Sequence, residues 1–350
     1  MNQPVPAFMS TFERRAWTAA QLLVFLIGAG IVLALLVRPA LGLYLLWDVL
    51  IPVAPLLLVM APGVWRNVCP LGTFSILPAR MRLSRRRVVS RRWQSRLFAG
   101  AVGLLLLIVP LRHVVLDLYG VATGIVLLAA AALALGLGVV FDWKSAWCSG
   151  LCPVYPVELL YGSRPLLAVK NAHCSSCSSC VSPCRDSSPG ATPQTTLTTG
   201  AGRGAAILLV GGFPGFVLGW YLVKLEPSTP LPTALGTAYA HPLAGMLVSA
   251  LLYAGFARLR PRATGTLSHL FAALAVAIYY WFKLPVMLGL EGDGSHALPG
   301  LHGLLPDWSI WLVRIVSSVG LLLFLSVRSS RRGWQIRPAR RATRRAALNS

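Results

Sequence analysis

The chain has 350 residues, of which 56% are hydrophobic and 12% are charged, and it carries 32 Lys and Arg against 10 Asp and Glu. So apolar a composition excludes a soluble domain of ordinary make-up. A helix crosses a bilayer with about 20 mostly apolar residues. Eight stretches meet this requirement: residues 17–37, 40–62, 97–116, 118–141, 204–223, 239–257, 267–290 and 309–327. The sequence therefore predicts an all-α polytopic membrane protein with about eight transmembrane helices.

The first stretch follows Glu13, Arg14 and Arg15 and has full spanning length, so we expect a retained first helix and not a cleavable signal peptide. The second stretch contains Asp48 and two prolines and is the weakest of the eight.

Lys and Arg are distributed unevenly between the two sides of these spans. Eight spans put both termini on one side, and that side holds 27 of the 32 Lys and Arg residues. Cytoplasmic loops carry an excess of Lys and Arg. We therefore expect an inner (cytoplasmic) membrane protein with both termini and all seven cysteines on the cytoplasmic side. The asymmetry also explains the net charge of +22 without nucleic acid, and the basic tail, residues 328–350, is expected to bind anionic lipid or stay solvated.

Four cysteines form one short run with the spacing C-x2-C-x2-C-x3-C, which is that of bacterial ferredoxins. They are Cys174, Cys177, Cys180 and Cys184. Cytoplasmic thiols stay reduced, so metal ligation is favoured over disulfides. Two residues between thiolates let a tight loop reach three corners of one cubane, whereas zinc sites usually have two separated C-x2-C pairs. We expect a 4Fe-4S cluster in a small ferredoxin-like loop over residues 166–203.

The other three cysteines lie in two Cys-Pro motifs. Cys69-Pro70 and Cys152-Pro153 are 83 residues apart, and each follows a pair of spans. The second motif is a full C-x3-C-P with Cys148, whereas Trp65 stands where the first motif would have its earlier cysteine. Residues 1–165 are therefore interpreted as two copies of one unit: helix pair, Cys-Pro loop and interfacial segment.

With Cys69-Pro70-Leu71-Gly72, Cys148, Cys152-Pro153 and the cysteine run, the chain resembles the membrane-bound 4Fe-4S polyferredoxins of the NapH/NosR type over about residues 40–190. The resemblance implies electron transfer between a quinone pool or another donor and a partner redox system, and a related group is linked to copper reduction. The chain departs from the family pattern in having one ferredoxin run, in which Arg185 follows Cys184, and no flavin-binding domain.

Seven cysteines are one fewer than two all-cysteine cubanes need, which leaves two arrangements open. In the first arrangement, a second cluster is held by Cys69, Cys148, Cys152 and Cys184. In two-cluster ferredoxins the fourth cysteine of a run serves the other cluster in this way. Alternatively, the run holds a single cluster and the Cys-Pro loops form a separate thiol or metal site.

Ionisable residues inside spans are costly and often functional. Those expected toward the outer ends of the helices are Asp48, Arg112, His113, His241, Lys283 and Arg314. One interpretation is a polar layer for a quinone head group and its protons. The favoured alternative is snorkelling and structural pairing, such as Asp48 with Arg314. A b-type haem on His113 and His241 is the least favoured reading.

The sequence thus predicts an integral membrane iron–sulfur protein, acting as an electron-transfer subunit of an oxidoreductase system. It would relay electrons between a cytoplasmic-side donor or partner protein and a membrane acceptor such as quinone. Two alternatives are a copper-handling or cupric-reductase-like assembly factor, since soft thiolates favour Cu(I), and a transporter with a structural or regulatory cluster. The sequence has no Ser/His/Asp or phosphate-cradling motif, and "GGFPG" at 211–215 is expected to bend its helix. Residues 204–327 form a second four-span bundle.

Overall fold

The structure is a computed structural model of the chain. It describes residues 9–87, 89–142, 144–162, 165–167, 169, 171–173, 193, 200–226, 228–292, 301 and 304–327. The cysteine run Cys174–Cys184 and the basic tail lie outside the described residues.

Eight helical segments are long and apolar enough to cross a membrane, as the sequence predicts. They are Thr11–Val37, Pro39–Met60, Arg92–Leu116, Gly120–Val140, Gly200–Tyr221, Leu231–Leu259, Pro261–Met287 and Trp308–Ser326. The described residues contain no β-strand beyond an isolated bridge between Arg87 and Phe141. The all-helical, multi-pass membrane class is therefore confirmed.

The first four spans and the segments between them are here called the first bundle. Its helices are α1 (Thr11–Val37), α2 (Pro39–Leu43), the π-helix η1 (Tyr44–Leu50), α3 (Ile51–Met60), α4 (Pro62–Val68), α5 (Pro70–Arg80), α6 (Arg91–Leu111), the π-helix η2 (Arg112–Leu116), α7 (Gly120–Val140), the π-helix η3 (Lys144–Leu151) and α8 (Val154–Tyr161). A capping box, in which Ser10 and Glu13 bond each other's backbone N–H, begins α1.

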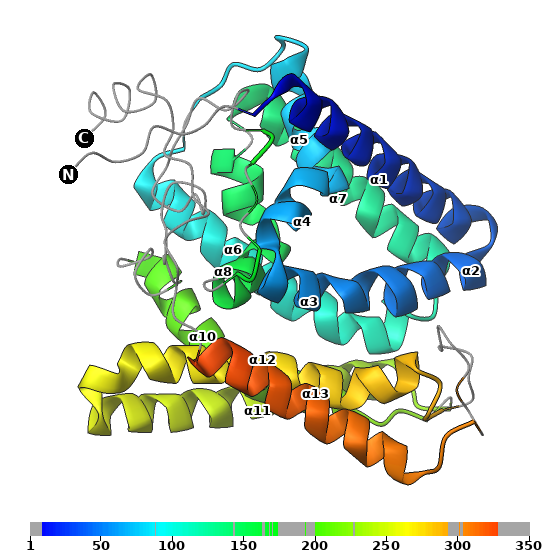
Figure 1. Cartoon of the computed structure of the whole chain (residues 1–350), viewed down its shortest axis with the longest axis vertical. Helices are drawn as coiled ribbons and strands as arrows, with labels where there is room; N and C mark the ends of the chain where they lie inside the picture. Colours follow the sequence, from blue (N-terminus) through cyan, green and yellow to red (C-terminus); the bar gives the residue numbers. More distant parts are fainter. Residues whose placement is uncertain are drawn as a thin grey trace.

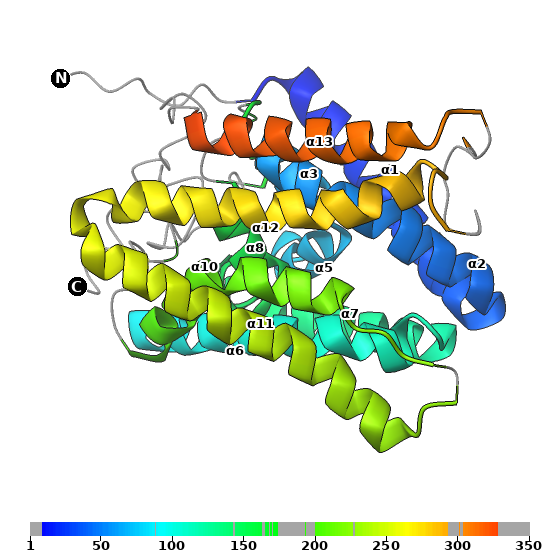
Figure 2. The same cartoon turned by 90° about the horizontal axis from the view of Figure 1, so that it is seen from below.

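The second bundle contains α10 (Gly200–Tyr221), α11 (Leu231–Leu259), the short 3-10 helix η5 (Pro261–Ala263), α12 (Thr264–Met287) and α13 (Trp308–Val327). The first bundle lies above α11, α12 and α13 in Figure 1, and α6 also packs against α10. Seen in Figure 2, the turn between α11 and α12 lies at the left of the molecule, whereas α2, the end of α12 and the start of α13 lie at the right. The spans therefore run back and forth between two ends, as a multi-pass protein requires.

Small residues let α10 and α11 approach closely. A Cβ added at Gly215 would clash with the carbonyl oxygen of Gly245, and one added at Gly219 would clash with that of His241. The hydroxyl of Ser249 donates to the carbonyl of Gly211 at 2.6 Å. The glycine-rich stretch is therefore the contact face of a tightly packed helix pair, a role beyond the bending expected from the sequence.

The second span, predicted to be the weakest of the eight, is more apolar than the fifth, sixth and seventh spans, so that prediction is wrong. It runs through α2, η1 and α3, and a side chain of α12 bonds to its backbone. The Tyr280 hydroxyl accepts from the backbone N–H of Leu56 at 2.9 Å and donates to the carbonyl of Pro52 at 2.6 Å. It stands between two groups that bond each other directly in a regular α-helix. The prolines of this span are thus accommodated by a side chain from a neighbouring helix.

The two Cys-Pro segments occupy corresponding places in the first bundle. α5, which follows Cys69, packs against α7, and α8, which follows Cys152, packs against α3. Each therefore contacts the second span of the other helix pair. In addition, α4 packs on α1 and η3 packs on α6, which is the first span of its own helix pair in each case. The contacts of α5 and α8 with the other pair bring the two Cys-Pro loops to the same region of the bundle.

Candidate functional site

The Cys69 and Cys152 thiols each lie at the start of a helix. Burial raises the pKa of Cys69, while the backbone N–H groups of Gly72 and Leu71 hydrogen-bond its sulfur and oppose that rise. Burial also raises the pKa of Cys152 to about 12, with an added contribution from the nearby Cys69, against hydrogen bonds from the N–H groups that follow it. Both sulfurs thus have donors at a helix N-terminus, an arrangement that favours thiolate once a cation offsets the desolvation.

Cys148 lies beside the same site. A Cβ added at Gly72 would lie 3.6 Å from the Cys69 Cβ and 3.7 Å from the Cys148 sulfur, so the absence of a side chain at Gly72 leaves room for both cysteines. The structure therefore gathers Cys69, Cys148 and Cys152 in one region. Across the part of the chain that the structure describes, however, no three His, Cys, Asp or Glu side chains are placed so that they could hold a metal ion.

A buried ion pair borders the thiols. The Arg66 guanidinium lies 2.6 Å from the Glu158 carboxylate, and both side chains are nearly inaccessible, at 11% and 7% exposed. The negative charge of Glu158 contributes to raising the pKa of Cys69 and of Cys152. Arg66 comes from α4 and Glu158 from α8, so the pair joins the segment before one Cys-Pro motif to the helix after the other.

The chain that leads to the cysteine run follows α4 toward this site. The N–H groups of Leu166 and Leu167 both donate to the carbonyl of Met60, at 2.7 and 3.0 Å. Farther along, the carbonyl oxygen of Val169 lies 3.0 Å from where a Cβ at Gly63 would be.

The end of this segment, residues 171–173, is held by the buried side chains of Asn67 and Asn171 and contains the buried His173. The N–H of Ala172 donates to the Asn67 side chain at 2.9 Å, and the N–H of His173 donates to that of Asn171 at 2.8 Å. The His173 ring is wholly buried and lies 3.3 Å from the Arg80 guanidinium at the end of α5. Asn67 precedes Cys69 by two residues, so the last described residue before the run is held close to the Cys-Pro site.

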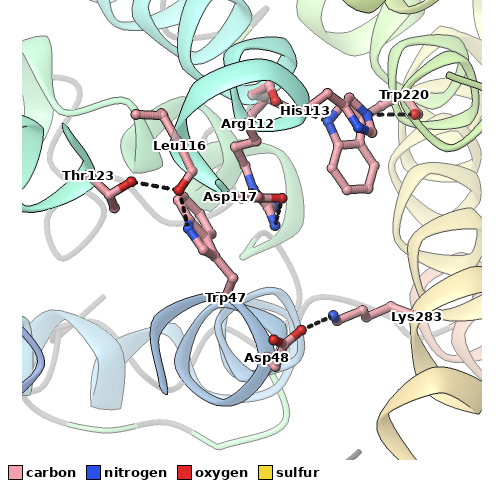
Figure 3. A network of polar contacts seen from close by, with 10 residues as sticks. Trp47, Asp48, Arg112, His113, Leu116, Asp117, Thr123, Trp220 and Lys283 are labelled. Atoms are coloured by element: carbon pink, nitrogen blue, oxygen red, sulfur yellow. Dashed lines mark hydrogen bonds and ion pairs between the residues drawn. The ribbon is translucent and has the colours of Figure 1, made fainter. Parts of the chain in front are cut away.

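At the other end of the first bundle, charged side chains form pairs (Figure 3). Asp48, on η1, lies 2.7 Å from the Lys283 ammonium of α12, with the two side chains 8% and 15% exposed. Arg112, on η2, binds both carboxylate oxygens of Asp117, at 2.9 and 3.1 Å. Its guanidinium carbon also lies 3.9 Å from the centre of the Trp47 ring and 5.0 Å from that of Trp220.

Arg314 repeats this design in the second bundle. It binds both carboxylate oxygens of Glu291 at 2.8 Å and lies 5.6 and 5.3 Å from the ring centres of Trp281 and Trp311. The suggested pairing of Asp48 with Arg314 is therefore wrong, because Asp48 pairs with Lys283 and Arg314 with Glu291. Arginine–carboxylate pairs held between tryptophans fit the aromatic belt at a membrane interface.

His113 and His241 make separate contacts. The His113 Nε2 lies 3.0 Å from the carbonyl oxygen of Trp220, to which it must donate, so this nitrogen carries a proton. His241 is exposed and its Nδ1 lies 3.1 Å from the carbonyl of Thr237, within its own helix. These bonds give no support to a haem held between them.

Sequence reasoning missed several residues that build these sites, chiefly Asn67, Glu158 and Tyr280. Glu158 carried a usable signal, since it is an acid within the apolar stretch "VYPVELLY". Comparisons of the chain with protein-family models, with curated proteins and with solved structures found no match. The resemblance to membrane-bound polyferredoxins therefore stays a prediction based on the cysteine motifs.

Proposed function

We propose that this multi-pass membrane protein is an iron–sulfur electron carrier. It accepts electrons from a soluble donor or partner subunit on the basic, cytoplasmic side of the membrane and passes them to an acceptor in the bilayer, most simply a quinone. The run Cys174–Cys184 would hold a 4Fe-4S cluster, which supplies one-electron transfer when bound.

The observation that carries the proposal is the anchoring of the segment just before the run. The bonds from Ala172 to Asn67 and from His173 to Asn171 fix the chain beside the Cys-Pro thiols. A ferredoxin-type run that begins there starts next to three further cysteines, at one end of the transmembrane helices. Such a place suits a carrier that exchanges electrons between a soluble partner and the membrane.

The Cys-Pro thiols fit a metal only in part. Two of them have helix N-terminal donors, yet the described residues include no complete set of three metal ligands. Cys69, Cys148 and Cys152 would therefore need a ligand from elsewhere, as the two-cluster arrangement with Cys184 supposes.

The second candidate function is copper handling, and the clustered thiols favour it. Soft thiolates select Cu(I), and Cys69 lies close enough to the buried Cys152 to contribute to raising the pKa of that thiol. The ionisable residues in the spans support neither electron transfer nor copper handling, because Asp48, Lys283 and Arg314 form ion pairs.

Iron, sulfide and copper analysis of the purified protein distinguishes the two candidate functions. We expect iron and acid-labile sulfide in equal amounts, and loss of both in Cys177→Ser, while the control Ser178→Ala retains them. Undiminished iron in Cys177→Ser would show that the run does not hold the cluster. Copper in place of iron, lost in Cys152→Ser, would favour the second candidate.

A further inference from the structure

A strongly basic loop joins α5 to α6 at the inner end of the first bundle. Residues 81–87, here called the basic loop, contain four arginines, Arg82, Arg85, Arg86 and Arg87, all of them exposed. Exposed Arg80 precedes the loop, and exposed Arg92 and Arg96 follow it on α6. Residues 80–96 contain no Asp or Glu.

Large apolar side chains are exposed among these arginines. Met81 and Leu83 are 58% and 63% exposed, and Trp93, on the first turn of α6, is 57% exposed. α6 enters a membrane span at Arg92, so these apolar side chains lie level with the end of that span. Apolar anchors next to arginines at this depth suit the boundary between acyl chains and head groups, where tryptophan is also enriched.

The basic loop is fixed to the rest of the bundle by its backbone. The N–H of Arg85 donates to the carbonyl of Val139 at 2.8 Å, and the N–H of Arg87 donates to that of Val140 at 3.2 Å. The Asp142 N–H returns a bond to the carbonyl of Arg87 at 2.9 Å. Because these bonds hold the loop to the end of α7, the arginines are presented in a fixed arrangement.

Two of the arginines hold a backbone conformation that favours glycine. Arg82 has φ of 60° and Arg86 has φ of 50°, and within the described residues no other non-glycine residue has positive φ. A bulky residue in this region carries strain, which is often found at functional sites. The side chain of Arg86 is used within the protein, since it donates to the carbonyl of Ala79 at 3.3 Å. No side-chain bond to another described residue accounts for Arg82, so its side chain is available to a ligand.

We propose that the basic loop, with Trp93, binds the head groups of anionic phospholipids in the leaflet on the basic side. The guanidinium groups of Arg82, Arg85 and Arg87 would bind the lipid phosphates, while Met81, Leu83 and Trp93 contact the acyl chains. This inference is independent of the iron–sulfur proposal, because it uses none of the cysteines.

The test is lipid binding to detergent-solubilised full-length protein, titrated with phosphatidylglycerol or phosphatidylcholine and read by native mass spectrometry. A basic side chain near an anionic surface contributes about 1 kcal/mol, which is about a fivefold change in affinity. The triple variant R82Q/R85Q/R87Q should therefore weaken phosphatidylglycerol binding by at least tenfold and leave phosphatidylcholine binding unchanged. The control R258Q/R260Q/R262Q removes the same charge from three exposed arginines at the α11–α12 turn and should have a smaller effect.

Arg82→Gly provides a second measurement that does not depend on a large loss of charge. Glycine adopts positive φ without strain, so this variant should be at least as stable as the wild type to thermal unfolding and yet bind phosphatidylglycerol less tightly. Equal losses in both triple variants, or unchanged lipid binding in Arg82→Gly, would overturn the proposal. Displacement of phosphatidylglycerol by an RNA oligonucleotide at comparable concentration would assign the loop to nucleic acid instead and would also overturn it.

Discussion

The ion pair between Asp48 and Lys283 joins the two bundles, and its removal should destabilise the protein in a diagnostic way. The charges are 2.7 Å apart and almost inaccessible. At this distance their attraction is about 6 kcal/mol with an effective dielectric constant of about 20. The desolvation of each ion opposes this by several kcal/mol, so the net contribution of the intact pair is small. Removing one partner leaves a buried charge without compensation and should cost about 3–5 kcal/mol.

Lys283→Met, Asp48→Asn and the double variant form a mutant cycle that measures this coupling. The free energy of unfolding can be followed by titrating SDS into mixed micelles. Each single variant should lose about 3–5 kcal/mol, and the double variant should recover most of that loss because no unpaired charge remains. The control Lys224→Met, at an exposed position, should change stability by less than about 0.5 kcal/mol.

If the losses of unfolding free energy add up in the double variant, or if each single loss is below about 1 kcal/mol, the pair is not a buried, coupled contact between the bundles. The same variants also separate structure from function. If the pair is structural, the double variant should transfer electrons at the wild-type rate. Loss of transfer in a stable double variant would return Asp48 and Lys283 to a proton-handling role.

Four further predictions concern packing, hydrogen bonding, pH and topology. Gly215→Ala should destabilise the protein by about 1–3 kcal/mol or more, because its Cβ would meet the backbone of α11. The control Gly204→Ala lies on the same helix, where a Cβ would meet open space, and should be neutral or stabilising by up to about 1 kcal/mol. SDS unfolding compares the two variants. Tyr280→Phe should cost about 1–2 kcal/mol in the same assay, because it removes a hydroxyl with two hydrogen bonds. In metal-free protein, burial raises the pKa of Cys152 to about 12, so the folded state holds the thiol proton more tightly than the unfolded state. The stability that the protonated thiol contributes is complete below about pH 8.5 and is lost as the pH rises toward 12. A Cys152→Ala variant should lose that part of the pH dependence of the free energy of unfolding. A reporter fused after Ser350 should be active only in a form that works in the cytoplasm, and activity of a periplasmic reporter would reverse the assigned orientation.

The eight spans could be predicted from the sequence because spanning a bilayer is a matter of length and apolarity. The prediction that the second span is the weakest was wrong, because this span is more apolar than the fifth, sixth and seventh spans, and its support by Tyr280 was not predicted. Tyr280 lies more than 220 residues from Pro52 and Leu56, and no local pattern links a tyrosine to a hydrogen-bond ladder that distant in the chain.

The partners of charged residues were beyond the sequence for the same reason. Depth along a span is set by 1.5 Å per residue, and it placed Asp48, Lys283 and Arg314 toward the same end. Which of them meet depends on how α12 is rotated against η1 and α13, and this is decided by packing of the whole bundle. The Cys-Pro spacing, in contrast, was informative because both motifs occur at the start of a helix, where backbone N–H groups face the sulfur.

An EPR spectrum of the purified, dithionite-reduced protein shows whether the cysteine run holds an iron–sulfur cluster. We expect the spectrum of a reduced 4Fe-4S cluster, with iron and sulfide in matching amounts, that disappears in Cys177→Ser and persists in Ser178→Ala. Protein purified without oxygen that contains no iron and gives no such spectrum, while still inserted and folded, would contradict the iron–sulfur proposal.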